Sequence, residues 1–271
     1  MSKLSRLMTL AIAALVAVAL AVPALAQEDE TANVRVAHLS PDAPSVDVYL
    51  NDEPVPELQG VPYTTVSDYL PVPAGTQSVT VYAAGETSEP VIEADVDLTA
   101  GQDYTVGAVG LVGDETLTAQ VWEDDNATPE EGNGHLRVVH ASPDAGAVDV
   151  GPQDGENLVE GLEFPDAAEY APVPADSYTI EVKGAGTDEA VVSVPDVAVA
   201  DGTVYSAFAT GLAEDDSLEV ILTEDNVATG EAGGETEGEL PDSGGYPVSL
   251  LVGVSLLAAG GLFALRRRSQ A

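Results

Sequence analysis

The chain of 271 residues contains one segment twice. Residues 34–43 (VRVAHLSPDA) return as residues 136–145 (LRVVHASPDA), and residues 69–74 (YLPVPA) return as residues 170–175 (YAPVPA). A chain that resembles itself at a fixed spacing folds as copies of one structural unit. We therefore expect two tandem domains, with a polar linker between them; the predicted ranges are 33–128, 129–135 for the linker, and 136–229.

Within each copy, short segments rich in Val and Thr alternate with clusters of Pro, Gly and Asp, which is typical of an all-β sandwich. For the first copy this pattern predicts seven strands, over residues 34–39, 46–50, 63–70, 78–83, 91–98, 104–111 and 117–122. Seven strands favour an immunoglobulin-like topology. Tyr104 and Tyr205 each follow a glycine three residues earlier. This spacing resembles the tyrosine corner of such sandwiches, in which the phenol bonds back to the preceding chain.

The first residues have the order of a secretory signal peptide. Lys3 and Arg6 precede an apolar stretch over residues 7–20, and Ala24-Leu25-Ala26 supplies the small residues of a cleavage site. We expect residues 1–26 to be removed and the mature chain to begin near Gln27.

The last residues predict a membrane anchor. Residues 246–265 carry no charge and, at about 1.5 Å per residue, are long enough to cross the roughly 30 Å hydrocarbon layer as one transmembrane helix. Arginines collect on the cytoplasmic side of a span, so residues 266–271, which begin with three arginines, are predicted as a cytoplasmic tail. The preceding chain would then be extracellular, with the Gly- and Glu-rich residues 230–245 as an acidic stalk.

A pentapeptide, Leu240-Pro241-Asp242-Ser243-Gly244, ends this stalk. It resembles the Leu-Pro-any-Thr-Gly sorting signal of Gram-positive surface proteins, although Ser243 stands where that signal has Thr. The resemblance implies that a sortase transpeptidase cuts after Ser243 and joins the chain to the cell wall, which makes sortase and the wall the expected partners. The alternative is a single-span membrane anchor that is not cleaved.

Charge narrows the classes of partner. The chain has 47 acidic and 8 basic residues, and five of the basic residues lie in the two terminal segments, so the predicted exported part keeps 8 − 5 = 3. Its formal charge is then 3 − 47 = −44, which excludes nucleic acid as a partner because binding to phosphates requires a basic patch. Cations, basic proteins or simply a salty medium can supply the counter-charge. The alternative explanation of the acidity is solubility or salt tolerance. The chain has no cysteine, so no disulfide stabilises the exported domains.

The segment His-x-Ser-Pro-Asp follows the first predicted strand of each copy. Because side chains alternate along a strand, His38 shares a face with Val34 and Val36, while Ser-Pro-Asp has the composition of a type I turn. A buried imidazole needs a hydrogen-bond partner, which Asp42 or Asp47 could supply. We predict a structural network of charged residues in each copy: Arg35, His38, Asp42 and Asp47, and Arg137, His140, Asp144 and Asp149.

The alternative for the same residues is a metal or ligand site through His38, Asp42 and Asp47. One histidine with scattered Asp lacks the convergent ligands of a zinc site, and a two-residue spacing does not by itself give the geometry of a catalytic triad. Calcium fits the acidic residues at the end of each copy better, because it prefers oxygen ligands. The candidate calcium ligands are Glu123, Asp124, Asp125, Glu224 and Asp225, with a solvated acidic loop as the alternative.

The opening of each copy and the later Tyr-x-Pro-Val-Pro-Ala are similar to secreted bacterial repeats known as domain of unknown function 4397. This resemblance implies an extracellular β-sandwich module, often in tandem and attached to the cell surface, with no assigned reaction. We expect a cell-wall-anchored or membrane-anchored surface protein with an adhesion or envelope-structural role and without catalysis. The alternative is an extracellular binding module for a small solute or a divalent cation.

Overall fold

The computed structural model describes residues 30–226. The predicted signal peptide, stalk, sorting signal, membrane span and cytoplasmic tail lie outside the described residues. Between residues 30 and 226, none of the helical structure is long and apolar enough to serve as a membrane span. These residues form sixteen strands and one short 3-10 helix, Pro56–Leu58, so the all-β prediction is confirmed.

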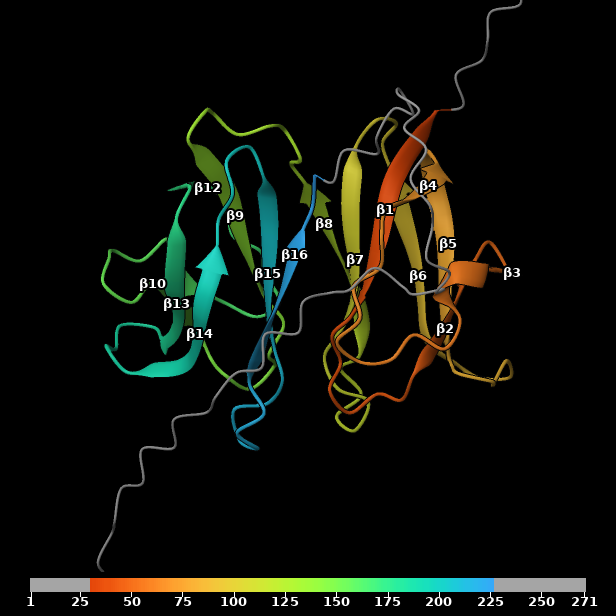
Figure 1. Cartoon of the computed structure of the whole chain (residues 1–271). Helices are drawn as coiled ribbons and strands as arrows, with labels where there is room; N and C mark the ends of the chain where they lie inside the picture. The colour runs from red at the N-terminus through yellow and green to blue at the C-terminus, as the bar shows by residue number, and fades with distance from the viewer. Residues whose placement is uncertain (1–29, 227–271) are drawn as a thin grey trace, which may run out of the picture. The chain divides into compact units, whose positions relative to one another are not determined.

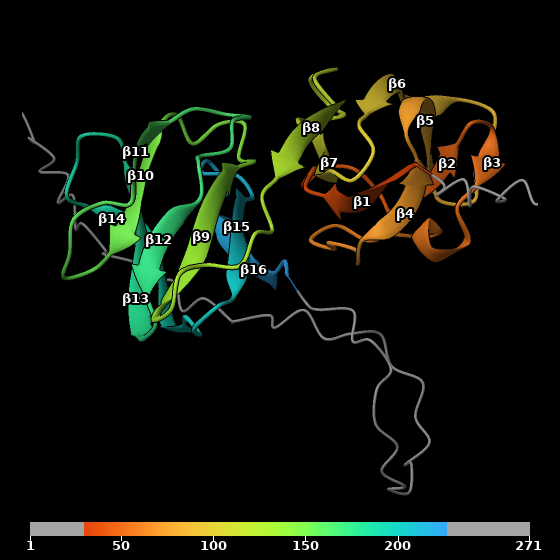
Figure 2. The ribbon, with the colours of Figure 1, turned by 90° about the horizontal axis from the view of Figure 1, so that it is seen from above.

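The first eight strands form two sheets of four strands, which we call the first repeat (Figure 1, orange to yellow-green). In chain order they are β1 (Thr31–His38), β2 (Val46–Leu50), β3 (Glu53–Pro54), β4 (Leu70–Pro73), β5 (Gly75–Ala83), β6 (Pro90–Leu98), β7 (Asp103–Val109) and β8 (Thr118–Asp124). Sheet A has the order β4-β1-β7-β8, and sheet B has the order β3-β2-β5-β6. The view from above separates these two layers (Figure 2).

The other eight strands repeat this arrangement as the second repeat. They are β9 (Asn133–His140), β10 (Val148–Pro152), β11 (Val159–Leu162), β12 (Ala171–Pro174), β13 (Ser177–Gly184), β14 (Ala190–Ala198), β15 (Val204–Thr210) and β16 (Glu219–Glu224). Sheet C has the order β12-β9-β15-β16, and sheet D has the order β11-β10-β13-β14. The order of strands matches that of the first repeat position by position, as the sequence duplication predicts.

The strand order departs from the immunoglobulin-like prediction. In that fold the first strand pairs with the second, and the third with the sixth, whereas here β1 lies inside sheet A and pairs in parallel with β7. The Ser40-Pro41-Asp42 turn explains the change, because it carries the chain straight from β1 in sheet A to β2 in sheet B. The two-layered sandwich is therefore confirmed, and the immunoglobulin order is corrected.

The strand predicted over residues 63–70 does not form. Thr64 has a φ of 70°, a left-handed conformation that interrupts an extended strand. The chain turns there against the end of β1, with the Thr64 amide donating to the His38 carbonyl at 2.9 Å. A single bridge joins Val66 to Ala37 of β1, and continuous pairing begins at β4. The prolines of β4 are tolerated because it is an edge strand of sheet A.

The tyrosine corners are present as hydrogen bonds. The Thr99 amide donates to the Tyr104 hydroxyl at 3.2 Å, and the Ala200 amide donates to the Tyr205 hydroxyl at the same distance. Each bond ties the loop before a central strand to that strand, as the spacing after the glycine predicts.

The central strands of sheets A and C are largely buried on both faces. One face of each packs against its own repeat: Tyr205 and Ala207 of β15, for example, belong to the core of the second repeat. The other faces meet in a shared apolar cluster, whose buried members are Ala37, Leu39, Val66, Val109 and Trp122 from the first repeat, and Val139, Ala141, Phe208 and Ile221 from the second. Every residue of β15 is consequently buried.

Candidate functional site

The shared faces of sheets A and C also enclose two arginines. Arg35 on β1 is 2% exposed, and it lies on the opposite face of the strand from Val34 and Val36 because side chains alternate. Its guanidinium donates to Asp225 Oδ1 at 2.5 Å and to Ser206 Oγ at 3.1 Å, both in the second repeat. Its Nε donates to Thr105 Oγ1 of the first repeat at 2.8 Å. Arg35 therefore joins the two repeats.

Arg137 on β9 makes the reciprocal connection. Its Nη2 lies 2.6 Å from Asp124 Oδ1 of the first repeat, although Asp124 Oδ1 has no aligned hydrogen-bond donor, so this contact is an ion pair. Its Nη1 donates to the Glu123 carbonyl at 3.0 Å, and its Nη2 also donates to Ser206 Oγ at 3.1 Å. Each repeat thus supplies one arginine and one aspartate, and each arginine pairs with the aspartate of the other repeat.

Two tyrosines complete this arrangement, which we call the inter-repeat network. The Arg35 guanidinium lies 4.9 Å from the centre of the Tyr69 ring, and the Arg137 guanidinium lies 4.7 Å from that of Tyr170. The Tyr69 hydroxyl donates to Asp124 at 2.5 Å, and the Tyr170 hydroxyl donates to Asp225 at 3.3 Å. A cation over an aromatic ring is attracted by the ring quadrupole, so each arginine is held by a ring as well as by a carboxylate.

Burial and charge both fix the protonation of this network. Burial alone would lower the pKa of Arg35, but the charge of Asp225 and the hydrogen bond to it more than offset this, so the pKa lies above the ordinary value of arginine. Burial also raises the pKa of Tyr69 and Tyr170, by more than the nearby guanidinium groups lower it. The tyrosines consequently remain hydrogen-bond donors to the carboxylates at any physiological pH.

The sequence predicted Arg35 and Arg137 as network members but assigned no partners to them. It missed Tyr69 and Tyr170, and it missed the hydroxyl groups of Thr105 and Ser206, which donate to the buried carboxylates of Asp124 and Asp225 respectively. A usable signal was present, because these residue types return at matching places in the two copies. Spacing alone does not show that the pairs cross from one repeat to the other.

The histidines have a different partner from the predicted one. His38 and His140 are fully buried, as the strand alternation predicts, but His38 Nε2 lies 3.0 Å from the Pro44 carbonyl and His140 Nε2 lies 2.7 Å from the Gly146 carbonyl. A carbonyl can only accept, so Nε2 carries the proton in both rings. Burial is the main reason that the pKa of each histidine lies below the ordinary value, and the carbonyl bonds offset this only in part.

The aspartates of the Ser-Pro-Asp turns accept hydrogen bonds from backbone amides of nearby loops, not from the histidines. Asp42 accepts the amides of Val112 and Gly113, both at 2.8 Å, in the loop after β7. In the second repeat, Asp144 likewise accepts two amides of the loop after β15. Partial burial by itself raises the pKa of these carboxyl groups, but the backbone hydrogen bonds outweigh it, so the pKa of both is lowered.

Asp47 and Asp149 act in the same way on sheets B and D. Asp47 accepts the Gly60 amide at 2.6 Å and the Gly85 amide at 2.8 Å. Asp149 accepts the corresponding amides of the second repeat at 2.7 and 2.9 Å, and these bonds lower its pKa. The residues of the predicted network therefore act separately in each repeat. The arginine joins the repeats, the histidine bonds to a backbone carbonyl, and the aspartates accept backbone amides.

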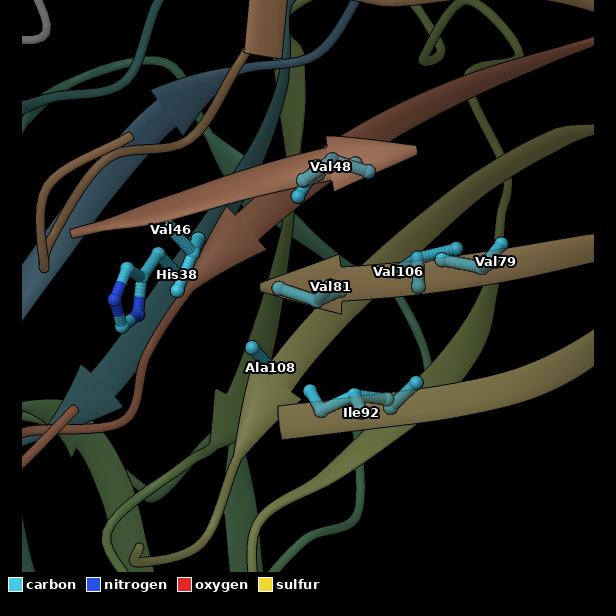
Figure 3. A pocket seen from close by; sticks show the side chains of 10 residues that line it. His38, Val46, Val48, Val79, Val81, Ile92, Val106 and Ala108 are labelled. Carbon is cyan, nitrogen blue, oxygen red and sulfur yellow. The ribbon is translucent and has the colours of Figure 1, made fainter. Parts of the chain in front are cut away.

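His38, Ser40 and Asp42 do not form a proton relay. The Ser40 hydroxyl donates to the Gly110 carbonyl at 2.7 Å, while His38 Nε2 is turned to the Pro44 carbonyl. A cavity of about 20 Å³ lies beside His38 and is otherwise lined mainly by Val and Ala side chains of the core (Figure 3). This volume accommodates about one water molecule, whereas ligand pockets hold several hundred Å³.

The candidate calcium ligands do not converge. Asp124 and Asp225 turn inward to the arginines, while Glu123, Asp125 and Glu224 are exposed, because neighbouring residues of a strand point to opposite sides. Over residues 30–226, the structure contains no group of three or more His, Cys, Asp or Glu side chains that could hold a metal ion. The carboxylates of Asp124 and Asp225 contact guanidinium and hydroxyl groups instead.

Fold and site together define a class: tandem β-sandwich proteins whose two repeats share a buried, ion-paired interface. The model of one family, described as domain of unknown function (DUF4397), matches residues 32–151 and 152–235. The chain belongs to this family. The boundary between the two matched segments falls within β10, whereas the structural boundary between the two repeats falls between β8 and β9.

Other comparisons add little. No curated protein matches the sequence. Among solved structures, the Bacillus anthracis TIE protein is similar over 68% of this chain at 12% identity, with a TM-score of 0.21. The chain spans about a third of that protein's length, 34%. A TM-score this low carries no argument about fold or function.

Proposed function

We propose that this protein is exported and anchored at the cell surface, where its two sandwiches have an adhesive or envelope-structural role without catalysis. The observation that carries the proposal is the inter-repeat network, which joins two sandwiches through buried, reciprocal ion pairs. Removing one partner of such a pair leaves an uncompensated buried charge and costs several kcal/mol. Two sandwiches coupled in this way suit a module that must keep one arrangement while it is displayed or pulled.

The use of the polar groups supports the same proposal. The aspartates of the Ser-Pro-Asp turns bond to backbone amides, the histidines bond to backbone carbonyls, and the buried aspartates bond to arginines. These groups stabilise loops and interfaces. Binding through the outer surfaces of the sheets therefore fits this chain better than chemistry in an internal pocket.

The terminal sequences support export and attachment. We propose that residues 1–26 are a signal peptide, that residues 33–128 and 136–229 are the two extracellular domains, and that residues 240–244 are read by a sortase. The uncharged residues 246–265 and the three arginines after them supply the remaining parts of a wall-sorting signal.

Mass spectrometry of the cell-wall fraction tests the attachment. We expect a mature chain that begins near Gln27 and ends at Ser243, linked to peptidoglycan. A chain in the membrane fraction that retains Arg266 would replace the wall anchor by a membrane anchor. The intact chain in the cytosol, with its first residues uncut, would contradict export.

Deleting residues 33–229 while keeping both termini tests the role. We expect unchanged growth and reduced attachment of the cells to surfaces or to one another. A variant with Arg35→Met and Asp225→Asn is the more selective comparison, because it removes one ion pair between the repeats without leaving a buried charge unpaired. Attachment equal to that of the unmodified strain in the deletion variant would contradict the adhesive role.

A further inference from the structure

The outer face of sheet B carries an aromatic pair. Tyr49 on β2 and Tyr82 on β5 lie with their ring centroids 5.2 Å apart and their planes at 79°. Both side chains are partly exposed, and in an edge-to-face pair only one of the four ring faces is covered by the other ring. The pair points away from the core, because Val48 and Val81, their neighbours in the chain, belong to the apolar cluster between sheets A and B.

The fold does not require these tyrosines. The strand register places Tyr82 opposite Asp47, and in the second repeat it places Lys183 opposite Asp149. By the same register, Tyr49 corresponds to Gly151. Both repeats form the same pair of sheets with different residues at these positions, so the aromatic pair is a special property of the first repeat.

Carboxylates border the pair. Asp47 lies directly opposite Tyr82 on β2, and the next strand, β6, presents exposed Glu93 and Asp95 on the same face. In the second repeat, Ser193 takes the register position of Glu93. The outer face of sheet B is therefore both acidic and aromatic. The corresponding face of sheet D lacks the aromatic pair and has a serine in place of Glu93.

Basic residues of the described chain do not neutralise this face. Residues 30–226 contain three basic residues, of which Arg35 and Arg137 are buried in the inter-repeat network. The third, Lys183, lies on sheet D, 3.3 Å from Glu181. Within residues 30–226, no basic side chain is therefore left to meet the outer face of sheet B.

The inter-repeat network contains the same combination of groups, because a cation there contacts both a tyrosine ring and carboxylates. Arg35 lies over the Tyr69 ring while its guanidinium contacts carboxylates. We propose that the face of sheet B around Tyr49 and Tyr82 binds a cationic polypeptide segment, with Lys or Arg side chains over the two tyrosine rings and the exposed carboxylate of Glu93 beside them. This inference deepens the proposed adhesive role, since it assigns a basic protein as the partner.

Fluorescence anisotropy of a labelled deca-arginine peptide, titrated with the purified full-length chain, tests the proposal. In Tyr49→Ser/Tyr82→Ser the net charge is unchanged, and we expect the Kd to rise about tenfold because two cation–π contacts are lost. Tyr49→Phe/Tyr82→Phe keeps both rings, so its Kd should stay within about threefold of the unmodified chain. The Phe variant also controls for folding, because it fills the same space.

The carboxylates have a matched control in the second repeat. Glu93→Gln removes one charge beside the tyrosines, and Glu189→Gln removes one charge from an exposed loop of the second repeat. At physiological salt, charges farther away than about 8 Å are largely screened. We expect the first variant to weaken binding about fivefold and the second to change the Kd by less than about twofold.

Three results would overturn the proposal: no binding by the unmodified chain at low salt, equal Kd values for the Ser and Phe variants, or equal losses from the two charge variants. The last two would show that the net charge of the chain alone attracts the peptide. Binding of a neutral oligosaccharide that depends on Tyr49 and Tyr82, without peptide binding, would also contradict it. None of these results bears on export or anchoring, which the wall-fraction experiment tests separately.

Discussion

The two repeats agree in the charged residues of their interface and differ in the apolar residues around them. Arg35 and Arg137, Tyr69 and Tyr170, and Asp124 and Asp225 are equivalent pairs, and all six belong to the inter-repeat network. In contrast, the first repeat places Gly107 and Trp122 where the second places Phe208 and Thr223. The charged groups need fixed partners, whereas apolar volume can be exchanged between neighbouring positions as long as the space is filled.

The largest effect should come from breaking one ion pair of this network. We expect Arg35→Met to lower the free energy of unfolding by about 3–5 kcal/mol, because Asp225 would remain buried without its guanidinium. Chemical denaturation followed by tryptophan fluorescence measures this, since Trp122 lies in the shared cluster.

The double variant Arg35→Met/Asp225→Asn sharpens this prediction. It removes both charges, so we expect it to recover a large part of the stability lost in Arg35→Met. The reciprocal set, Arg137→Met with and without Asp124→Asn, should behave in the same way if the two pairs are equivalent. A single variant as stable as the unmodified protein would show that the pair contributes little.

The apolar difference can be tested at Gly107. A Cβ at this position would lie 2.5 Å from the Trp122 ring, so Gly107→Ala should lower the free energy of unfolding by about 1–3 kcal/mol through overpacking. Replacing Trp122 by Thr, the residue at position 223 of the second repeat, removes the ring. The Ala substitution should then cost much less in the Trp122→Thr background than in the unmodified chain, and equal costs in both backgrounds would contradict the steric argument.

The buried histidines predict a pH dependence above the range in which aspartates titrate. The pKa of His38 and His140 is lowered from 6.5 by burial, so below pH 6.5 the unfolded chain binds protons that the folded chain does not. Stability should therefore fall as the pH drops from 6.5, by up to about 1.4 kcal/mol per pH unit for each histidine. His38→Gln/His140→Gln should flatten the profile of unfolding free energy between pH 6.5 and 5, and an unchanged slope would assign it to other groups.

The smallest effect is expected for the aspartates of the Ser-Pro-Asp turns, which accept hydrogen bonds from loop amides. The pKa of Asp42 lies below 3.8 because its backbone hydrogen bonds favour the charged carboxylate. These bonds therefore stabilise the fold above pH 3.8. The stabilisation is lost as the pH falls through the lower pKa of the folded state. Asp42 is exposed, and Asp42→Asn should cost on the order of 1 kcal/mol at neutral pH. Thermal unfolding at neutral and at strongly acidic pH checks this: the difference from the unmodified chain should vanish in acid, and a difference that persists there would contradict the assignment.

Local patterns predicted the parts of the fold that depend on neighbouring residues. The alternation around Val34 and Val36 correctly placed His38 in the core, and the Ser-Pro-Asp composition correctly predicted a turn after β1. The strand over residues 63–70 was wrong, because the positive φ of Thr64 depends on how that segment packs against the end of β1. The partners of His38 were wrong for a similar reason, since backbone carbonyls carry no signature in the sequence.

By itself, the sequence determined that this chain is a duplicated all-β protein with an acidic surface, since duplication, strand alternation and charge can be read from residue order alone. The tertiary structure decided what the buried charges do. Arg35 and Asp225 are 190 residues apart in the chain, and no local pattern relates them. Their pairing exists because sheets A and C bury the same faces against each other, and a buried guanidinium must find a carboxylate there.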